Sequence, residues 1–318
     1  MSNAASAHGT AAMSADEPSL GRPRSGRAIV WCVPRSRSSI LAKCMTGLPG
    51  NSVWLAHFSA SEWLSSVYAE HTGKVLPDCY AGNEAVYVEA AAVMTKLKNY
   101  KPELELMGYA DIQRQIEADA SQYVFMKDQA YAMATENHRR FLPVGFHHAF
   151  LIREPSRVFT SVRNAMSRIL RENGTYHENV SILKDDTTVH GHLALFKKQY
   201  DLWQYVRENI DPDPLVIDSY DLASHPDVVL KALCDRVGFP YDDSLLSWQP
   251  GATPWNLPTP SAEETHHAYY ATALKSTHFS APGEEGPLPR DQLTDDVIQC
   301  VDASLPYYEE MCQHKLKV

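Results

Sequence analysis

The sequence lacks the features that mark membrane, secreted and metal-binding proteins. No stretch approaches the roughly 20 apolar residues that a membrane-spanning helix needs. The first 27 residues lack the apolar core of a secretory signal. The six cysteines form no Cys-x-x-Cys pair and no zinc-like spacing, and His190 and His192 have no acidic partner at ligand spacing. These absences predict a cytoplasmic protein with free thiols, no membrane partner and no bound metal.

Positive charge is also scarce. The 318 residues include 29 Lys and Arg against 39 Asp and Glu, a formal net charge of −10. A nucleic-acid-binding surface needs a basic stripe, so this balance argues against a nucleic-acid partner. Any anionic ligand must therefore be held by a small local cluster of arginines and backbone N–H groups.

Short apolar runs alternate with helical patterns after a polar tail. Residues 1–27 contain almost no large apolar side chains and predict a disordered tail, followed by a single domain over 28–318. The strands are predicted at 28–33, 123–126, 149–152 and 215–217, with a weaker one at 52–55. The helices are predicted at 60–71, 84–97, 109–120, 156–172, 193–209, 226–237 and 293–311. This alternation predicts an α/β fold, with three α/β/α layers around a central parallel sheet.

The loop after the first predicted strand has the composition of a phosphate site. It reads Pro34-Arg35-Ser36-Arg37-Ser38-Ser39 and runs directly into a predicted helix. A helix N-terminus presents unpaired N–H groups and the positive end of the helix dipole. Arg35 and Arg37 add fixed charge, and the three serines add hydroxyl donors. The alternative is a solvated Arg/Ser turn with no ligand.

A second group of residues follows the strand predicted at 149–152. Arg153 comes directly after this strand, Pro155 opens the next helix, and Ser161 lies eight residues beyond the arginine. An arginine at the carboxyl end of a strand points into the ligand crevice of an open α/β sheet, where its guanidinium can grip a phosphate in bidentate fashion. The alternative is a surface arginine paired with Glu154 and a serine that packs locally.

On these residues the sequence resembles the sulfotransferase family that uses 3′-phosphoadenosine 5′-phosphosulfate (PAPS), whose fold is related to the P-loop NTPases. The resemblance implies that residues 34–39 bind the 5′-phosphosulfate and that Arg153 and Ser161 bind the 3′-phosphate. Residues 216–226 and the helix end at 238–240 are similar to further family segments.

The same resemblance implies roles for three other residues. Lys127, at the end of the strand predicted at 123–126, is similar to a family lysine that would act with Arg35 on the leaving oxygens. Residues 273–279 are similar to a short family stretch that covers the 3′-phosphate and the adenine. This similarity implies that Ser276 and Thr277 contribute to donor binding.

The general base departs from the family pattern. Cytosolic members place a histidine just after the third-strand lysine, where this chain reads Lys127-Asp128-Gln129. Related enzymes use a glutamate after the second strand, where this chain has His57 close by. His57 follows a predicted strand, is expected to face the crevice, and has a reference pKa of about 6.5. We therefore predict His57 as the base. The alternatives are Asp128, Glu62 and His138.

Together these patterns predict a PAPS-dependent sulfotransferase that acts on a hydroxyl or amine of a small organic acceptor. No metal is needed, since arginine, lysine and backbone dipoles supply the positive field. The acceptor is expected under the aromatic segments 54–63 and 248–255. The alternatives are a P-loop nucleotide or small-molecule kinase and a non-catalytic nucleotide-binding module. Ser38 stands where a Walker loop needs its lysine, which argues against the kinase. The oligomeric state is left open.

Overall fold

The computed structural model describes residues 24–186, 191–251, 253–258, 267–283 and 286–318. Most of the predicted tail, residues 1–23, lies outside the described residues. At the start of the described residues, the Arg24 amide donates to the Gly145 carbonyl at 2.7 Å. Within the described ranges, no helix is both long enough and apolar enough to cross a membrane.

A single parallel sheet forms the middle of the molecule, which confirms the predicted fold class. Its strands are β1 (Arg27–Cys32), β2 (Asn51–Leu55), β3 (Tyr123–Gln129), β4 (His147–Ile152), β5 (Leu215–Asp218) and β6 (Trp255–Asn256). They are arranged in the order β5-β4-β1-β3-β2-β6, and every pair is parallel. All five predicted strands are present. The edge strand β6 has only two residues, too few for any apolar pattern to indicate it.

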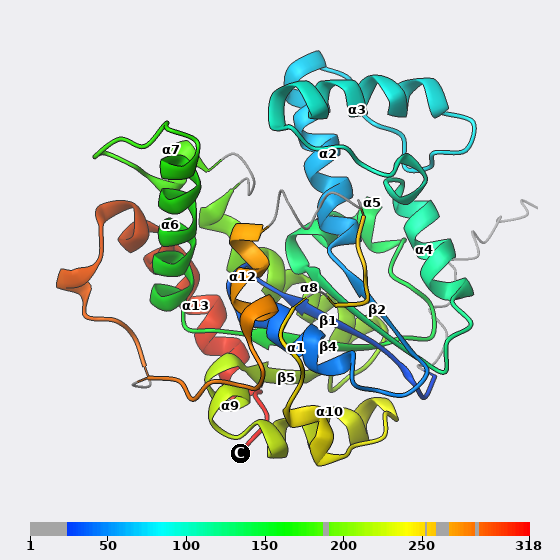
Figure 1. Cartoon of the computed structure of the whole chain (residues 1–318), viewed down its shortest axis with the longest axis vertical. Helices are drawn as coiled ribbons and strands as arrows, with labels where there is room; N and C mark the ends of the chain where they lie inside the picture. Colours follow the sequence, from blue (N-terminus) through cyan, green and yellow to red (C-terminus); the bar gives the residue numbers. More distant parts are fainter. Residues whose placement is uncertain (1–23, 187–190, 252, 259–266, 284–285) are drawn as a thin grey trace, which may run out of the picture.

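Helices cover both faces of the sheet (Figure 1). The longer ones are α1 (Ser38–Met45), α2 (His57–Thr72), α3 (Glu84–Lys98), α4 (Tyr109–Ala118), α6 (Pro155–Glu172), α8 (Leu195–Asn209), α10 (Pro226–Val237), α12 (His267–Lys275) and α13 (Asp295–Gln313). Short helices are α5 (Glu136–Arg139), α7 (Ile182–Asp185) and α9 (Ser219–Ser224). The seven predicted helices are present within a few residues of their expected ends.

The central strand β1 is apolar throughout because it is buried on both sides. Val30 packs with Leu41 of α1 and Leu230 of α10, whereas Trp31 packs on the other side with Trp203 of α8. Successive strand side chains point to opposite faces, so a sheet covered by helices on both sides needs a continuous apolar run. This arrangement leaves the carboxyl ends of the strands as the open edge of the sheet.

Helices α2 and α3 project beyond this edge, at the top of Figure 1. They have a small core of their own, which includes Leu64, Tyr68, Tyr87 and Met94. A separate core lets these helices hold side chains over the sheet edge. Trp63 of α2 and Tyr100, which follows α3, reach the candidate site.

Candidate functional site

The loop between β1 and α1 has an unusual backbone. Arg35 and Arg37 both have positive φ, 65° and 66°, while Ser36 between them does not. A left-handed conformation costs an ordinary residue roughly 1–2 kcal/mol, so two in one loop need a reason. Alternating signs of φ turn successive N–H groups toward one side, which forms an anion-binding concavity. The loop is therefore shaped for an anion.

Two serines of this loop have different positions. The Ser36 side chain is fully buried and its hydroxyl donates to the Val33 carbonyl at 2.9 Å. It holds the loop closed and does not line the cavity described below, which corrects its expected place among the ligand-binding hydroxyls. Ser38 is the first residue of α1 and does line that cavity.

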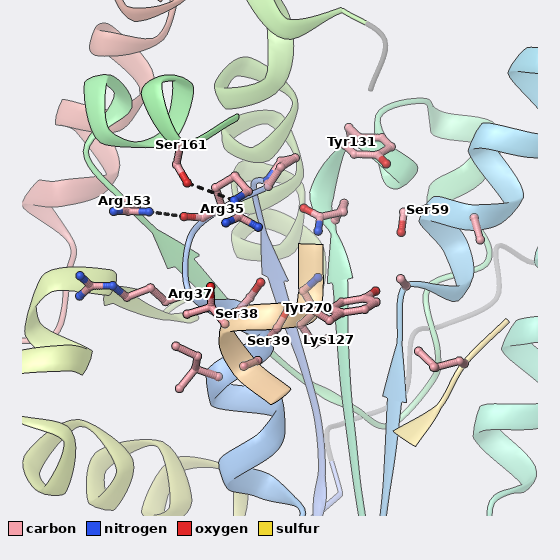
Figure 2. Close-up of a pocket in the computed structure, with 18 of the residues that line it drawn as sticks. Arg35, Arg37, Ser38, Ser39, Ser59, Lys127, Tyr131, Arg153, Ser161 and Tyr270 are labelled. Carbon is pink, nitrogen blue, oxygen red and sulfur yellow. Dashed lines mark hydrogen bonds between the residues drawn. The ribbon is translucent and has the colours of Figure 1, made fainter. Parts of the chain in front are cut away.

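The two predicted phosphate-binding groups are in direct contact (Figure 2). Arg153 donates to the Arg35 carbonyl at 2.5 Å, and Arg35 Nε donates to Ser161 Oγ at 3.1 Å. Glu154 does not hold Arg153 at the surface. Instead it caps α6, because its carboxylate accepts from the Arg157 amide at 3.0 Å. Residues more than a hundred positions apart thus meet at the carboxyl ends of β1 and β4.

This contact gathers positive charge in a partly buried place. Burial, and then the neighbouring Arg37, Arg35 and Arg157, lower the pKa of Arg153 to about 10. Burial and Arg157 also lower the pKa of Arg37. Guanidiniums that repel one another are stabilised by a shared anion. The scarce positive charge of the chain is therefore concentrated at a site suited to a multiply charged anion.

Lys127 is buried near the carboxyl end of the central strand β3 and is not an exposed strand-end residue. It pairs with Val30 and Leu55 on the neighbouring strands and is 3% exposed. The Gln129 side-chain amide is oriented so that both its oxygen and its nitrogen have hydrogen-bond partners. Its oxygen accepts from Lys127 Nζ at 2.8 Å. The same amide donates to the Cys32 carbonyl at 3.2 Å. Gln129 thereby fixes the ammonium at the end of the central strands.

A cavity of about 410 Å³ opens over these residues, within the range typical of small-molecule sites. Its polar wall includes Arg35, Arg37, Ser38, Ser39, Lys127, Arg153 and Ser161 (Figure 2). Its other wall is mainly apolar and aromatic and includes Ala60, Trp63, Tyr100, Tyr131, Leu257, Pro258 and Tyr270. A second cavity of about 100 Å³ shares Arg37 and Arg153 with the first. Its lining also includes the cations Arg157 and Lys315 and the carboxylates Glu154 and Asp218.

His57 does not lie in this cavity, which corrects the expectation that it faces the crevice. Ala56 adopts φ 60° and α2 begins at once, so His57 packs inward with its ring 4.9 Å from that of Trp54. The side chain is fully buried and neither ring nitrogen has a hydrogen-bond partner in the described structure. Burial lowers its pKa to about 3. A neutral, enclosed imidazole cannot reach an acceptor in the cavity.

Ser276 and Thr277 are also placed differently from expectation. The Ser276 hydroxyl donates to the Ala273 carbonyl at 2.6 Å and accepts from Trp248 Nε1 at 3.0 Å. The Thr277 hydroxyl contacts His278 at 2.9 Å on the surface. Neither residue lines either cavity, because both close the end of α12. The stretch 273–279 instead contributes Ala273 and Phe279 to the cavity lining.

The expected acceptor segments are only partly correct. Trp63 lines the cavity, with its ring 5.1 Å from that of Tyr100. Trp54, Trp248 and Trp255 do not line it. Trp248 packs on Phe279 and Trp255 packs on Tyr270. These two tryptophans therefore support the cavity wall from behind.

Two alternative bases lie outside the cavity. Glu62 and His138 face each other at 3.6 Å, beside the Tyr109 ring, and neither lines the cavity. The parts of the chain that the structure describes contain no cluster of three or more His, Cys, Asp or Glu that could hold a metal ion.

Several lining residues have no signal in the sequence. Ser59, Tyr100, Tyr131 and Tyr270 come from four separate segments and meet only in the fold. The sequence around the three tyrosines predicts a buried core position as readily as a place in a binding site, and Ser59 belongs to no motif. Only their position beyond the strand ends would have suggested them.

The chain is an open α/β sheet with an arginine-rich strand–loop–helix at its carboxyl edge, an arrangement suited to an anion. Residues 196–315 match the family model of the sulfotransferase domain. This match confirms the resemblance of the chain to the sulfotransferase family.

Other known proteins share parts of this similarity. Over 69 residues the chain is 35% identical to branched-chain-amino-acid aminotransferase-like protein 2 of Arabidopsis thaliana, which covers 22% of this chain and 11% of that protein. The solved sulfotransferase domain from the curacin biosynthetic pathway is 16% identical, with a TM-score of 0.43, covering 88% of this chain and 97% of that one. The sulfotransferase domain from the Synechococcus PCC 7002 olefin synthase is 19% identical, with a TM-score of 0.44, covering 89% and 94%.

Proposed function

We propose that the protein transfers the sulfuryl group of PAPS to a hydroxyl or amine of a small organic acceptor. The observation that carries this proposal is the cluster formed by Arg35, Arg37, Arg153 and Ser161 at one end of a cavity with an aromatic far wall. PAPS has phosphate groups at both ends of its ribose, and two adjoining arginine sites suit such a ligand. The small cavity beside Arg37 and Arg153 offers additional space for its nucleoside.

The transfer requires charge neutralisation on the leaving side. The bond between sulfur and the bridging phosphate oxygen breaks while a bond between sulfur and the acceptor atom forms. Negative charge then grows on the phosphate, where fixed donors lower the barrier. Arg35 and Lys127 supply positive charge there, and the backbone of the 35–39 loop supplies N–H groups. The residues themselves supply this field, so the chemistry proposed requires no metal.

The kinase alternative lacks its key cation. A Walker loop has a lysine at the start of its helix that reaches the β- and γ-phosphates. Here Ser38 begins α1, and the lysine of the site comes from β3. This arrangement favours PAPS over ATP, because the γ-phosphate of ATP needs a loop lysine and Mg²⁺.

Calorimetric titration with 3′,5′-bisphosphoadenosine, and separately with ATP and Mg²⁺, tests the donor assignment. We expect the bisphosphate to bind and ATP to bind more weakly by at least tenfold, which corresponds to about 1.4 kcal/mol. A preference for ATP would support the kinase instead. Incubation with PAPS and a panel of alcohols, phenols and amines then tests whether the bound donor is used; binding without any transfer would support the non-catalytic module.

A further inference from the structure

A buried carboxylate lies directly behind the cavity wall. Asp128 stands between Lys127 and Gln129, which both line the cavity, and its own side chain is fully buried. It accepts backbone hydrogen bonds from Phe58 at 2.8 Å, Ser59 at 3.2 Å and Gln129 at 2.7 Å. Asp128 therefore joins the end of β3 to the start of α2, at the junction of the polar and aromatic walls.

Ser59 connects this carboxylate with the cavity. Its amide is bound to Asp128 Oδ1, and its side chain lines the cavity (Figure 2). Because the Ser59 amide is bound to Asp128, the hydroxyl of the same residue is within reach of the carboxylate, and the Ser59 side chain lowers the pKa of Asp128. One hydroxyl thus has the reacting space on one side and a buried acid on the other.

The surrounding groups leave Asp128 as the base of this region. Among the described residues that line the cavity there is no Asp, Glu or His. Burial raises the pKa of the Tyr109, Tyr131 and Tyr270 phenols. The negative charge of Glu62 and then of Asp128 adds to this at Tyr109, whose hydroxyl donates to Glu62 and to the Ala132 carbonyl, and the charge of Asp128 adds to it at Tyr131 and Tyr270. All three phenols stay protonated and cannot take a proton. The thiol of Cys32 behaves in the same way.

The charge balance at Asp128 suits proton transfer. Burial raises its pKa more than any other influence, whereas Lys127, the Ser59 side chain and the backbone donors lower it, so that the pKa remains raised overall. A carboxylate whose pKa is moved toward neutrality is a better proton acceptor than an exposed one. Lys127 holds the leaving side of the reaction, and Asp128 adjoins it in the chain.

We propose that Asp128 accepts the proton of the acceptor hydroxyl through Ser59. This inference rests on the proposed sulfuryl transfer. The acceptor O–H proton moves to Ser59 Oγ as the Ser59 hydroxyl proton moves to Asp128 Oδ1. At the same time the acceptor oxygen bonds to sulfur and the sulfur–phosphate oxygen bond breaks, releasing the bisphosphate. Asp128 later returns its proton to water through the same serine.

The test compares two acceptors of similar shape that differ in acidity. Phenol is protonated at about pH 8, since its pKa is close to that of tyrosine at about 10, while 4-nitrophenol is mostly ionised. Wild-type protein, Ser59→Ala, Ser59→Thr and Asp128→Asn are assayed with PAPS and each phenol. Ser65→Ala, on the same helix but outside the cavity, is the matched control. Bisphosphoadenosine affinity and thermal unfolding check that each variant is folded.

We expect Ser59→Ala and Asp128→Asn to slow transfer to phenol by about 100-fold or more, while transfer to 4-nitrophenol stays within a few-fold. Ser59→Thr keeps a hydroxyl and should retain most of the rate. If Ser59→Ala leaves both rates unchanged, or lowers both equally, the relay is wrong while the sulfotransferase function stands. If the wild-type protein transfers to no member of the panel of alcohols, phenols and amines, the proposed function itself fails. Because Ser59→Ala leaves the backbone anchor intact, the test holds even if Asp128→Asn does not fold.

Discussion

Replacing Arg153 by alanine should separate ligand binding from protein stability. In the free protein, burial and three neighbouring guanidiniums lower the pKa of Arg153 to about 10. In the free protein the charge of Arg153 is thus opposed by burial and by its neighbours, and a bound anion relieves that repulsion. Hydrogen bonds to charged groups contribute about 1.5–3 kcal/mol.

We therefore predict that Arg153→Ala weakens bisphosphoadenosine binding by about 1.5–3 kcal/mol, which is roughly 10- to 150-fold in Kd. The free protein should lose little stability, because removing a repelled charge offsets the lost bond to the Arg35 carbonyl. Calorimetry at two salt concentrations measures the binding, and urea unfolding measures the stability. Arg168→Ala, on the helix that follows Arg153 but paired with Glu172 on the surface, is the control.

Unchanged affinity in Arg153→Ala would remove this residue from the site and refute the reasoning about shared charge. A large loss of stability without ligand would show that Arg153 serves the fold. A loss of affinity in Arg168→Ala as large as that in Arg153→Ala would mean that net charge, not the cluster, binds the anion.

Three further predictions concern other parts of the molecule. Burial lowers the pKa of His57 to about 3 and that of His148 to about 4. Because the unfolded chain binds these protons from about pH 6.5 downward and the folded chain does not, the unfolding free energy should fall by about 2 kcal/mol per histidine between pH 7 and 5. Urea midpoints that do not move with pH would contradict this. Lys43 Nζ donates to three carbonyls at the end of α12, at 3.0, 2.8 and 3.2 Å, so Lys43→Met should lower the unfolding free energy by about 1–3 kcal/mol; an unchanged urea midpoint would show that these carbonyls find other donors. Trp63→Ala should raise the KM for the acceptor severalfold and leave bisphosphoadenosine affinity unchanged, as measured by steady-state kinetics and calorimetry; a change in affinity alone would place Trp63 at the donor end.

The framework of the fold follows from local chemistry that the sequence displays. Strand β1 is predictable because burial on both faces demands an unbroken apolar run, and α6 begins where Pro155 and the Glu154 cap require it. The anion loop is visible for the same reason, since its charges directly follow that strand. The position of Arg153 beyond β4 likewise predicts a side chain at the open edge, where it lies.

The direction of individual side chains is much harder to predict. His57 occupies the expected place in the chain, but the positive φ of Ala56 starts the helix at once and turns the imidazole into the core. Ser276 resembles a ligand-binding serine, yet Trp248, distant in the sequence, takes its hydroxyl. The role proposed for Ser59, on α2, depends on Asp128 of strand β3. Such contacts are set by packing across the fold and leave no local pattern.

Transfer of labelled sulfuryl from PAPS to a hydroxyl acceptor is the most direct measurement of the central claim. With the wild-type protein and a mixed panel of phenols and alcohols, we predict one bisphosphoadenosine released for each labelled organic sulfate formed. At donor concentrations near the wild-type Kd, Arg153→Ala should reduce both products in parallel. Bisphosphate binding without any labelled product, or consumption of ATP in place of PAPS, would contradict the account.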